Sequence, residues 1–283
     1  MAAADLQAWV GRRETARDVL APVPLRALAA TLETGWPEPS PGVEVPPLAD
    51  WLYFLPIVPA SQIGPDGHPT KGGFLPPVPL ERRMWAGSRL LFTAPLRVGE
   101  PIERRSEILK VAQKDGRSGP MVFVTVRHEV HGPTGLAVEH EQDIVYLPLP
   151  ERWTPPPPVP LPGDLAWTEQ RRCDPVLLFR FSALTFNAHR IHYDRDYARE
   201  VEKYPGLVVH GPLQAILLMA AATARHPDRR PASFVFRGVR PLFDHDAVTL
   251  AARETAEGAL ELFTANGDAA VAMQATLSWR TAA

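Results

Sequence analysis

The segment that most constrains the fold is residues 211–226, because its sequence GPLQAILLMAAATARH predicts a helix that is apolar on nearly every side. Pro212 suits the first turn of a helix, and Pro227 ends the segment because proline cannot continue one. A helix without a solvent-facing side has to be enclosed by other elements. We therefore expect the rest of the chain to supply a sheet that covers it.

Segments with alternating apolar and polar residues predict that sheet. In residues 121–131, Val124, Val126 and Val130 face one way together with His128, while polar side chains face the other way. Residues 270–280 alternate in the same manner. Further strands are predicted at residues 89–96, 101–114, 136–147, 233–243, 247–255 and 260–265. This pattern is typical of an antiparallel sheet with one side exposed to solvent.

A proline-rich stretch divides the chain into two halves of similar size. Residues 151–164 are dense in proline, which favours an extended, stiff linker. Residues 1–150 and residues 165–283 are each long enough for a domain, and each contains one predicted helix, at residues 22–31 and 211–226. A Pro-Leu pair lies near the end of a predicted strand in each half, at residues 95–96 and 241–242. We predict an α+β protein in which a unit of helix and antiparallel sheet occurs twice.

Composition excludes several classes of function. The net charge is −2 and the pI is about 6.5, so the chain lacks the cationic excess that nucleic-acid binding requires. Cys173 is the single cysteine, which excludes internal disulfides and favours a reducing compartment. The sequence shows no secretory signal and no apolar run long enough to cross a membrane. We expect a cytoplasmic protein that binds neither nucleic acid nor a membrane.

The stretch that predicts chemistry lies shortly before the apolar helix. Six polar or ionisable side chains fall within eight residues: Asn187, His189, Arg190, His192, Tyr193 and Asp194. A histidine can accept a proton from water and return it near neutral pH. Asn187 can orient a water or a substrate oxygen, although an amide cannot act as a base. The alternative is that these histidines only cap a turn or a helix end.

A second candidate is VVHGPL, residues 208–213, at the start of the apolar helix. Gly211 allows a ligand to approach the backbone closely, and the N–H groups at a helix start bind anionic oxygens. A thioester oxygen that becomes an enolate would be stabilised there. A glycine-proline helix entry without any ligand is the alternative reading of the same residues.

Together these two segments resemble a known family. HYDRDYA (residues 192–198) and VHGPL (residues 209–213) are similar to the signature of MaoC-like hotdog (R)-specific enoyl-thioester hydratases and dehydratases. FSALTFNAHRIHYD (residues 181–194) most resembles the double-hotdog branch, which contains mitochondrial-type 3-hydroxyacyl-thioester dehydratases and the mesaconyl-C4-CoA and itaconyl-CoA hydratases. RRMWAG (residues 82–87) and PLRVG (residues 95–99) extend the resemblance to the first half.

The resemblance implies two fused hotdog units, each a long helix wrapped by an antiparallel sheet. The first unit, in residues 1–150, would be non-catalytic, and the second, in residues 165–283, would carry the catalytic motif. His192 matches the family's catalytic histidine, and Gly211 matches the residue whose backbone N–H stabilises the oxyanion. The family's usual carboxylate is replaced by Asn187, and its usual asparagine by His189. We therefore expect His192 to transfer protons, Asn187 to position water, and His189 to assist or to bind substrate.

Other residues are expected to bind substrate. Arg190 or His189 would contact a free carboxylate of the acyl group. Trp85, Arg82 and Arg83 could bind the 3′-phosphate of a nucleotide, although Trp85 could equally fill the core. The expected set of substrate-binding residues is His189, Arg190, His210, Trp85, Arg82 and Arg83. Asp194 is an alternative carboxylate, but its position favours a role in bracing the loop.

The sequence thus predicts a hydro-lyase that hydrates the α,β double bond of an enoyl-CoA. The resemblance favours a C5 dicarboxylic thioester, mesaconyl-C4-CoA or itaconyl-CoA. Two alternatives stay open: a dehydratase of 3-hydroxyacyl groups on CoA or acyl carrier protein, and a hotdog protein that binds an acyl thioester without turning it over. No metal or redox cofactor is expected, because CoA is part of the substrate and because His128 and His131 diverge on a strand. A homodimer is compatible with the sequence.

Overall fold

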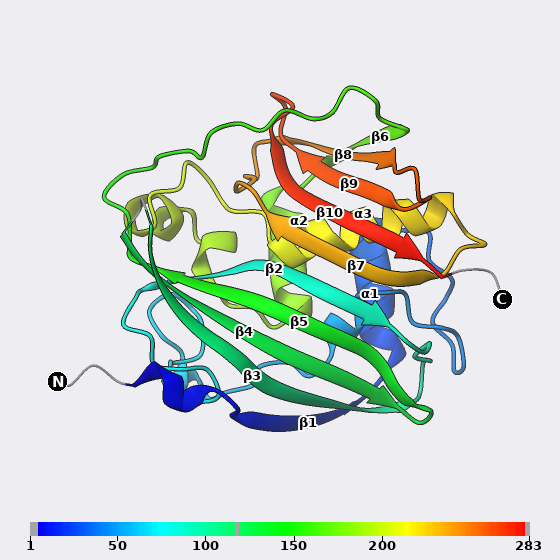
Figure 1. Ribbon diagram of the computed structural model, residues 1–283, viewed down its shortest axis with the longest axis horizontal. Helices are drawn as coiled ribbons and strands as arrows, with labels where there is room; N and C mark the ends of the chain where they lie inside the picture. Colours follow the sequence, from blue (N-terminus) through cyan, green and yellow to red (C-terminus); the bar gives the residue numbers. More distant parts are fainter. Residues whose placement is uncertain (1–4, 117–118, 281–283) are drawn as a thin grey trace.

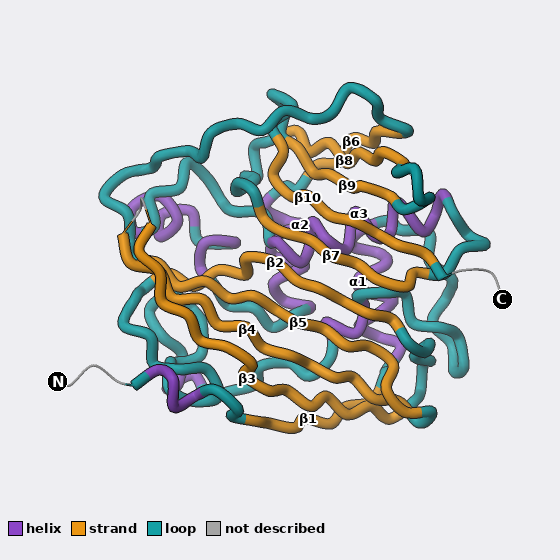
Figure 2. Tube along the Cα trace, in the orientation of Figure 1, coloured by secondary structure: helices purple, strands orange, loops and turns teal. Residues whose placement is uncertain are grey.

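The computed structural model describes residues 5–116 and 119–280 and contains one antiparallel sheet, with the helices on one of its faces (Figures 1 and 2). The strands are β1 (Arg13–Val19), β2 (Arg82–Phe92), β3 (Pro101–Gly116), β4 (Gly119–Gly132), β5 (Gly135–Leu147), β6 (Trp167–Arg172), β7 (Pro231–Gly238), β8 (Ala247–Glu254), β9 (Leu260–Ala265) and β10 (Val271–Trp279). The helices are α1 (Pro22–Leu32), α2 (Pro175–Leu184) and α3 (Gly211–Arg225). The α+β prediction is confirmed.

The two halves repeat one strand order. Across the sheet the order is β1-β3-β4-β5-β2 in the first half and then β7-β10-β9-β8-β6 in the second. Counted from its own outer edge, the second half reads β6-β8-β9-β10-β7, so every strand has a counterpart in the first half. The halves join where β2 pairs with β7, and a Cβ on Gly87 would lie 2.5 Å from the carbonyl oxygen of Phe236. Only glycine fits this junction.

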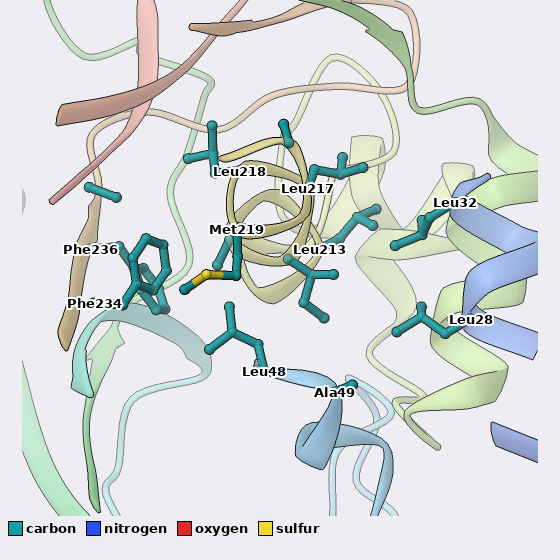
Figure 3. Packing of buried hydrophobic residues seen from close by; sticks show 14 of the residues in the cluster. Leu28, Leu32, Leu48, Ala49, Leu213, Leu217, Leu218, Met219, Phe234 and Phe236 are labelled. Atoms are coloured by element: carbon teal, nitrogen blue, oxygen red, sulfur yellow. The ribbon is translucent and has the colours of Figure 1, made fainter. Parts of the chain in front are cut away.

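Helix α3 is enclosed, as its sequence predicts. It packs on β8, β9 and β10, and nine of its fifteen residues are buried. Figure 3 shows its apolar side chains between Phe234 and Phe236 on one side and Leu28 and Leu32 of α1 on the other. Leu48, from the loop that follows α1, closes a third side.

In the first half, residues 5–116 and 119–150 contain no helix as long as α3. Twelve prolines lie between residues 37 and 79, and they prevent a long run of helical hydrogen bonds. Between α1 and β2 the described helices are only two short 3₁₀ turns, Ala49–Leu52 and Ala60–Gln62. Helix α1 itself has eleven residues and packs mainly on α2.

Several elements differ from the sequence prediction. β1, β6 and α2 were not predicted: β1 and β6 are largely polar edge strands, and α2 lies within an apolar run without clear periodicity. The Asp174 side chain caps α2 by accepting a hydrogen bond from the Leu177 N–H at 2.9 Å. β2 begins at Arg82, earlier than predicted, and β7 ends at Gly238, before the predicted end. Among the described residues, no helix is long and apolar enough to span a membrane.

Candidate active site

A large cavity of about 1610 Å³ lies between the two halves and is lined by residues of both. Its wall includes seven of the nine candidate site residues: Trp85, Arg82, Arg83, Asn187, His189, His192 and Gly211. His210 and Arg190 lie outside the wall. The glycine- and proline-rich loop around residues 67–75 also borders the cavity.

His192 lies at the end of a 3₁₀ turn (Arg190–His192) and is 7% exposed. Its Nδ1 lies 2.7 Å from the carbonyl oxygen of Val208. A carbonyl can only accept, so Nδ1 carries the proton and the neutral ring has its lone pair on Nε2. Burial lowers the pKa of His192 well below 6.5, and the neighbouring His210 and His189 lower it further. His192 is therefore a neutral ring, ready to accept a proton, at physiological pH.

His210 lies behind His192 and supports it. The two rings stack with centroids 3.6 Å apart and an angle of 19° between their planes. Nε2 of His210 is hydrogen-bonded to Ser182 Oγ at 2.8 Å, and burial lowers the pKa of this histidine to about 3. The structure thus places His210 as packing for His192 and gives it no surface on the cavity.

Gly211 is the first residue of α3 and borders the cavity. The N–H at this position has no acceptor within its helix, and the next residue, Pro212, has no N–H at all. A Cβ built on Gly211 would meet only the carbonyl oxygen of Trp85, at 3.9 Å. The backbone amide is therefore reachable by a ligand, and it is a hydrogen-bond donor at the positive end of a helix.

Asn187 and His189 are held next to each other. The Asn187 Oδ1 accepts a hydrogen bond from the His189 N–H at 3.0 Å, which leaves the amide nitrogen of Asn187 free to donate. The ring of His189 is almost perpendicular to that of His192, with centroids 5.4 Å apart. Nε2 of His189 lies 3.1 Å from Oε1 of Glu202. Glu202 was not among the candidates, although its side chain is only 1% exposed.

Arg82 reaches this group from the first half. Its Nε lies 3.1 Å from Oε2 of Glu202, and its guanidinium also donates to the hydroxyl of Tyr204. Arg82 is thus engaged with protein groups and braces the loop that carries Glu202. This arrangement does not leave its charge free for a nucleotide phosphate.

A loop of the first half docks on the catalytic loop. Asp66 Oδ2 is bonded to Nδ1 of His68 at 2.9 Å, and the His68 ring lies 4.1 Å from that of His189. The Arg190 N–H donates to the carbonyl oxygen of Asp66 at 2.9 Å. Gly67 has φ of +89°, and a Cβ there would lie 1.7 Å from the carbonyl oxygen of Ala188. The two loops touch backbone to backbone, and only glycine permits this contact.

Arg190 and Trp85 have roles that the sequence left open. Arg190 binds Asp194 through Nε at 3.0 Å and Nη2 at 2.8 Å, so the structure places it as a brace for the loop. Asp194 shares that role. Trp85 borders the cavity, but its indole N–H donates to Ser88 Oγ at 2.8 Å and its ring packs on Trp51, so it is part of both wall and core.

Arg83 and Arg240 are cavity arginines without an acidic partner among the described residues, and Arg83 lies next to Arg82 on β2. Arg82, by contrast, is paired with Glu202. Arg83 pairs across the sheet with Tyr146, and its positive charge lies close to the buried hydroxyl of that tyrosine. A carboxylate or phosphate of a ligand would satisfy this guanidinium.

One cluster has the composition of a metal site. Asp66, His68 and His189 offer ligand atoms that lie within 4.8 Å of one another. One nitrogen of each histidine is already bonded to a carboxylate, His68 to Asp66 and His189 to Glu202. These hydrogen bonds account for the proximity of the three side chains.

Comparison with known proteins places the chain in a family. Residues 48–244 match the family model described as hydroxyacyl-thioester dehydratase type 2. The chain belongs to this family. It is 49% identical to mesaconyl-C(4)-CoA hydratase of Chloroflexus aurantiacus, over 98% of this chain and 99% of the relative. It is 25% identical to the mitochondrial hydroxyacyl-thioester dehydratase type 2 of Schizosaccharomyces pombe, over 89% and 94% of the two chains.

Solved structures that superpose on this chain confirm the fold. A MaoC-like dehydratase superposes with a TM-score of 0.73 at 13% identity, covering 98% of this chain and all of that one. A Mycobacterium tuberculosis protein described as having a double hotdog fold superposes with a TM-score of 0.58 at 15% identity, over 95% and 96% of the two chains. The prediction of two fused hotdog units is confirmed.

Proposed function

We infer that this protein is a hydro-lyase that reversibly hydrates the α,β double bond of a C5 dicarboxylic enoyl-CoA, with mesaconyl-C4-CoA as the substrate. The observation that carries the reaction type is the single fixed tautomer of His192, whose Nδ1 is bonded to the Val208 carbonyl in a cavity that also exposes the Gly211 amide. The identity with the Chloroflexus aurantiacus hydratase over nearly the whole of both chains supports the substrate.

The mechanism follows from these groups. His192 Nε2 removes a proton from water as the oxygen attacks Cβ of the substrate. The thioester oxygen becomes an enolate oxygen and accepts a hydrogen bond from the Gly211 N–H. The protonated His192 then returns the proton to Cα of the enolate, which regenerates the neutral ring and completes the addition of one water across the double bond. Dehydration is the reverse sequence.

The position of Arg83 supports the assignment of a substrate with a free carboxylate. In mesaconyl-C4-CoA the free carboxylate is attached to Cβ, so it lies beside the attacking water. Arg190 is bonded to Asp194, whereas Arg83 borders the cavity without an acidic partner among the described residues. We assign Arg83 to the free carboxylate, with the Asn187 amide nitrogen as a second donor.

The test is to measure hydration of a panel of thioesters, monitored as the loss of the absorbance of the conjugated enoyl thioester. Mesaconyl-C4-CoA should be hydrated much faster than crotonyl-CoA, which lacks the second carboxylate, and faster than a 3-hydroxyacyl group on acyl carrier protein is dehydrated. His192→Ala should lower turnover by about a hundred- to ten-thousandfold while binding persists. Equal turnover of mesaconyl-C4-CoA and crotonyl-CoA would contradict the substrate assignment. Binding without turnover of any member would favour a non-catalytic acyl-thioester protein.

A further inference from the structure

Glu202 is a buried carboxylate near His192 that has no role in the proposed mechanism. Glu202 follows a single π-helical turn (Tyr197–Val201), and Lys203 after it has a positive φ of 62°. This irregular backbone turns the Glu202 side chain inward, where it is 1% exposed. Burying a carboxylate is costly unless each oxygen is bonded, and irregular turns of this kind often mark functional sites.

Both oxygens of Glu202 are used, and for different purposes. Oε2 is bonded to Nε of Arg82 at 3.1 Å, which stabilises the ionised form of the carboxylate. Oε1 is directed to Nε2 of His189 at 3.1 Å. The contact to His189 satisfies the second oxygen, and it also constrains which nitrogen of His189 carries a hydrogen.

That contact fixes the tautomer of His189. An ionised carboxylate only accepts hydrogen bonds, so Nε2 of His189 carries the hydrogen and the neutral ring has its lone pair on Nδ1. His192 has the opposite tautomer, with its hydrogen on Nδ1 and its lone pair on Nε2. Both rings border the same cavity and are almost perpendicular, with centroids 5.4 Å apart.

We propose that Glu202 is a positioning residue that makes His189 the second proton acceptor for the attacking water. A water has two hydrogens, and two acceptors of fixed tautomer would hold both of them, leaving an oxygen lone pair for Cβ. Asn187 is a weaker candidate for the second acceptor, because its amide is not basic and one lone pair of its Oδ1 already accepts from the His189 N–H. Glu202 thus provides, from another part of the loop, the carboxylate that position 187 lacks.

This inference rests on the proposed function, and a double-mutant cycle tests it separately. Glu202→Gln keeps the size of the side chain but removes the fixed acceptor, so kcat should fall about ten- to a hundredfold with little change in KM. In a His189→Ala background the same substitution should leave kcat almost unchanged, because Glu202 acts through His189. Equal losses in both backgrounds would overturn the proposal and leave Glu202 as a structural brace. A wild-type protein without hydratase activity would instead contradict the proposed function.

Two controls keep the cycle interpretable. Glu200→Gln, on the same turn but exposed, should not change kcat. If Glu202→Gln fails to fold because Arg82 is left unpaired, the double variant Arg82→Gln/Glu202→Gln restores a neutral hydrogen-bonded pair and should show the same loss of kcat.

Nitrogen-15 NMR of the histidine rings gives a readout that does not depend on activity. His189 should be observed with its hydrogen on Nε2 and His192 with its hydrogen on Nδ1. Glu202→Gln should change the tautomer of His189 and leave that of His192 unchanged. A wild-type His189 with its hydrogen on Nδ1 would overturn the proposal.

Discussion

The two halves share a strand order but fill their concave sides differently. In the second half the fifteen-residue α3 is enclosed by β8, β9 and β10. In the first half the proline-rich chain between α1 and β2 forms only short turns, and its loop residues border the cavity. Because no long helix fills the described part of the first half, a cavity remains between the halves. The N-terminus of α3, from the second half, borders this cavity.

The halves also use buried histidines differently. In the first half, His128 has both ring nitrogens bonded, Nδ1 to Ser106 Oγ at 2.8 Å and Nε2 to Gln142 Oε1 at 3.3 Å. In the second half, His192 has one nitrogen bonded to a carbonyl, and the other is left for a ligand. Both rings border the cavity, and burial lowers the pKa of both. Burial alone therefore does not make a histidine reactive, and His192 differs from His128 in having a ring nitrogen at the cavity without a protein partner among the described residues.

The largest expected effect tests this contrast directly. His192→Ala should lower kcat by about a hundred- to ten-thousandfold, because it removes the group that takes the proton from water. His128→Gln should leave turnover close to that of the wild type, because His128 serves a hydrogen-bond network. The measurement is initial-rate hydration of an enoyl-CoA by both variants. A large loss from His128→Gln would mean that the first half contributes to the chemistry.

Lowering the pH should reduce the free energy of unfolding through the buried histidines of both halves. Burial lowers the pKa of His128 and His210 to about 3 and that of His192 well below 6.5, whereas unfolding returns each to about 6.5. Below that pH the unfolded chain binds protons that the folded chain does not, so stability is lost as the pH falls. Each such histidine should cost about 2 kcal/mol of unfolding free energy between pH 7 and pH 5.

Urea unfolding at the two pH values checks this expectation. The His128→Gln variant should lose about 2 kcal/mol less than the wild type on going from pH 7 to pH 5, because one depressed histidine is gone. An unchanged pH dependence in this variant would show that His128 titrates normally in the folded protein.

The sequence predicts those parts of the fold and the site that are encoded by local sequence patterns. Helix α3, most strands, His192 and Gly211 follow from periodicity and short motifs, and the structure places both residues on the cavity. Glu202 was missed because it lies in a charged stretch, typical of a solvated surface, and a π turn changes the direction of its side chain. A π turn has no reliable sequence signature.

Contacts between the two halves could not be predicted from the sequence either. Asp66 and His68 lie more than a hundred residues before His189, in a loop without secondary structure, and no motif connects them. The one signal was Gly67, a glycine among prolines, whose positive φ and contact with Ala188 become visible only in three dimensions. The same limit explains why Arg82 and Arg83 were grouped, although Arg82 is ion-paired and Arg83 has no acidic partner among the described residues.

A smaller effect would sharpen the substrate assignment. Arg83→Gln should lower kcat/KM for mesaconyl-C4-CoA about tenfold, because it removes a hydrogen bond to a charged group. Crotonyl-CoA carries the same CoA but no free carboxylate, so its kcat/KM should not change. Parallel losses for both substrates would place Arg83 on the CoA phosphates.

The smallest expected effect concerns the loop by which the first half reaches the second. Gly67 and Gly72 both have positive φ, so alanine at either should cost about 1 kcal/mol of stability through backbone strain. A Cβ at Gly67 would collide with the Ala188 carbonyl oxygen, whereas at Gly72 it would meet Pro77 at an ordinary 3.7 Å. Gly67→Ala should therefore also lower turnover several-fold, because the loop can no longer hold His68 against His189, while Gly72→Ala should not. Equal turnover by the two variants, measured with equal folded fractions, would show that docking of this loop is not needed for catalysis.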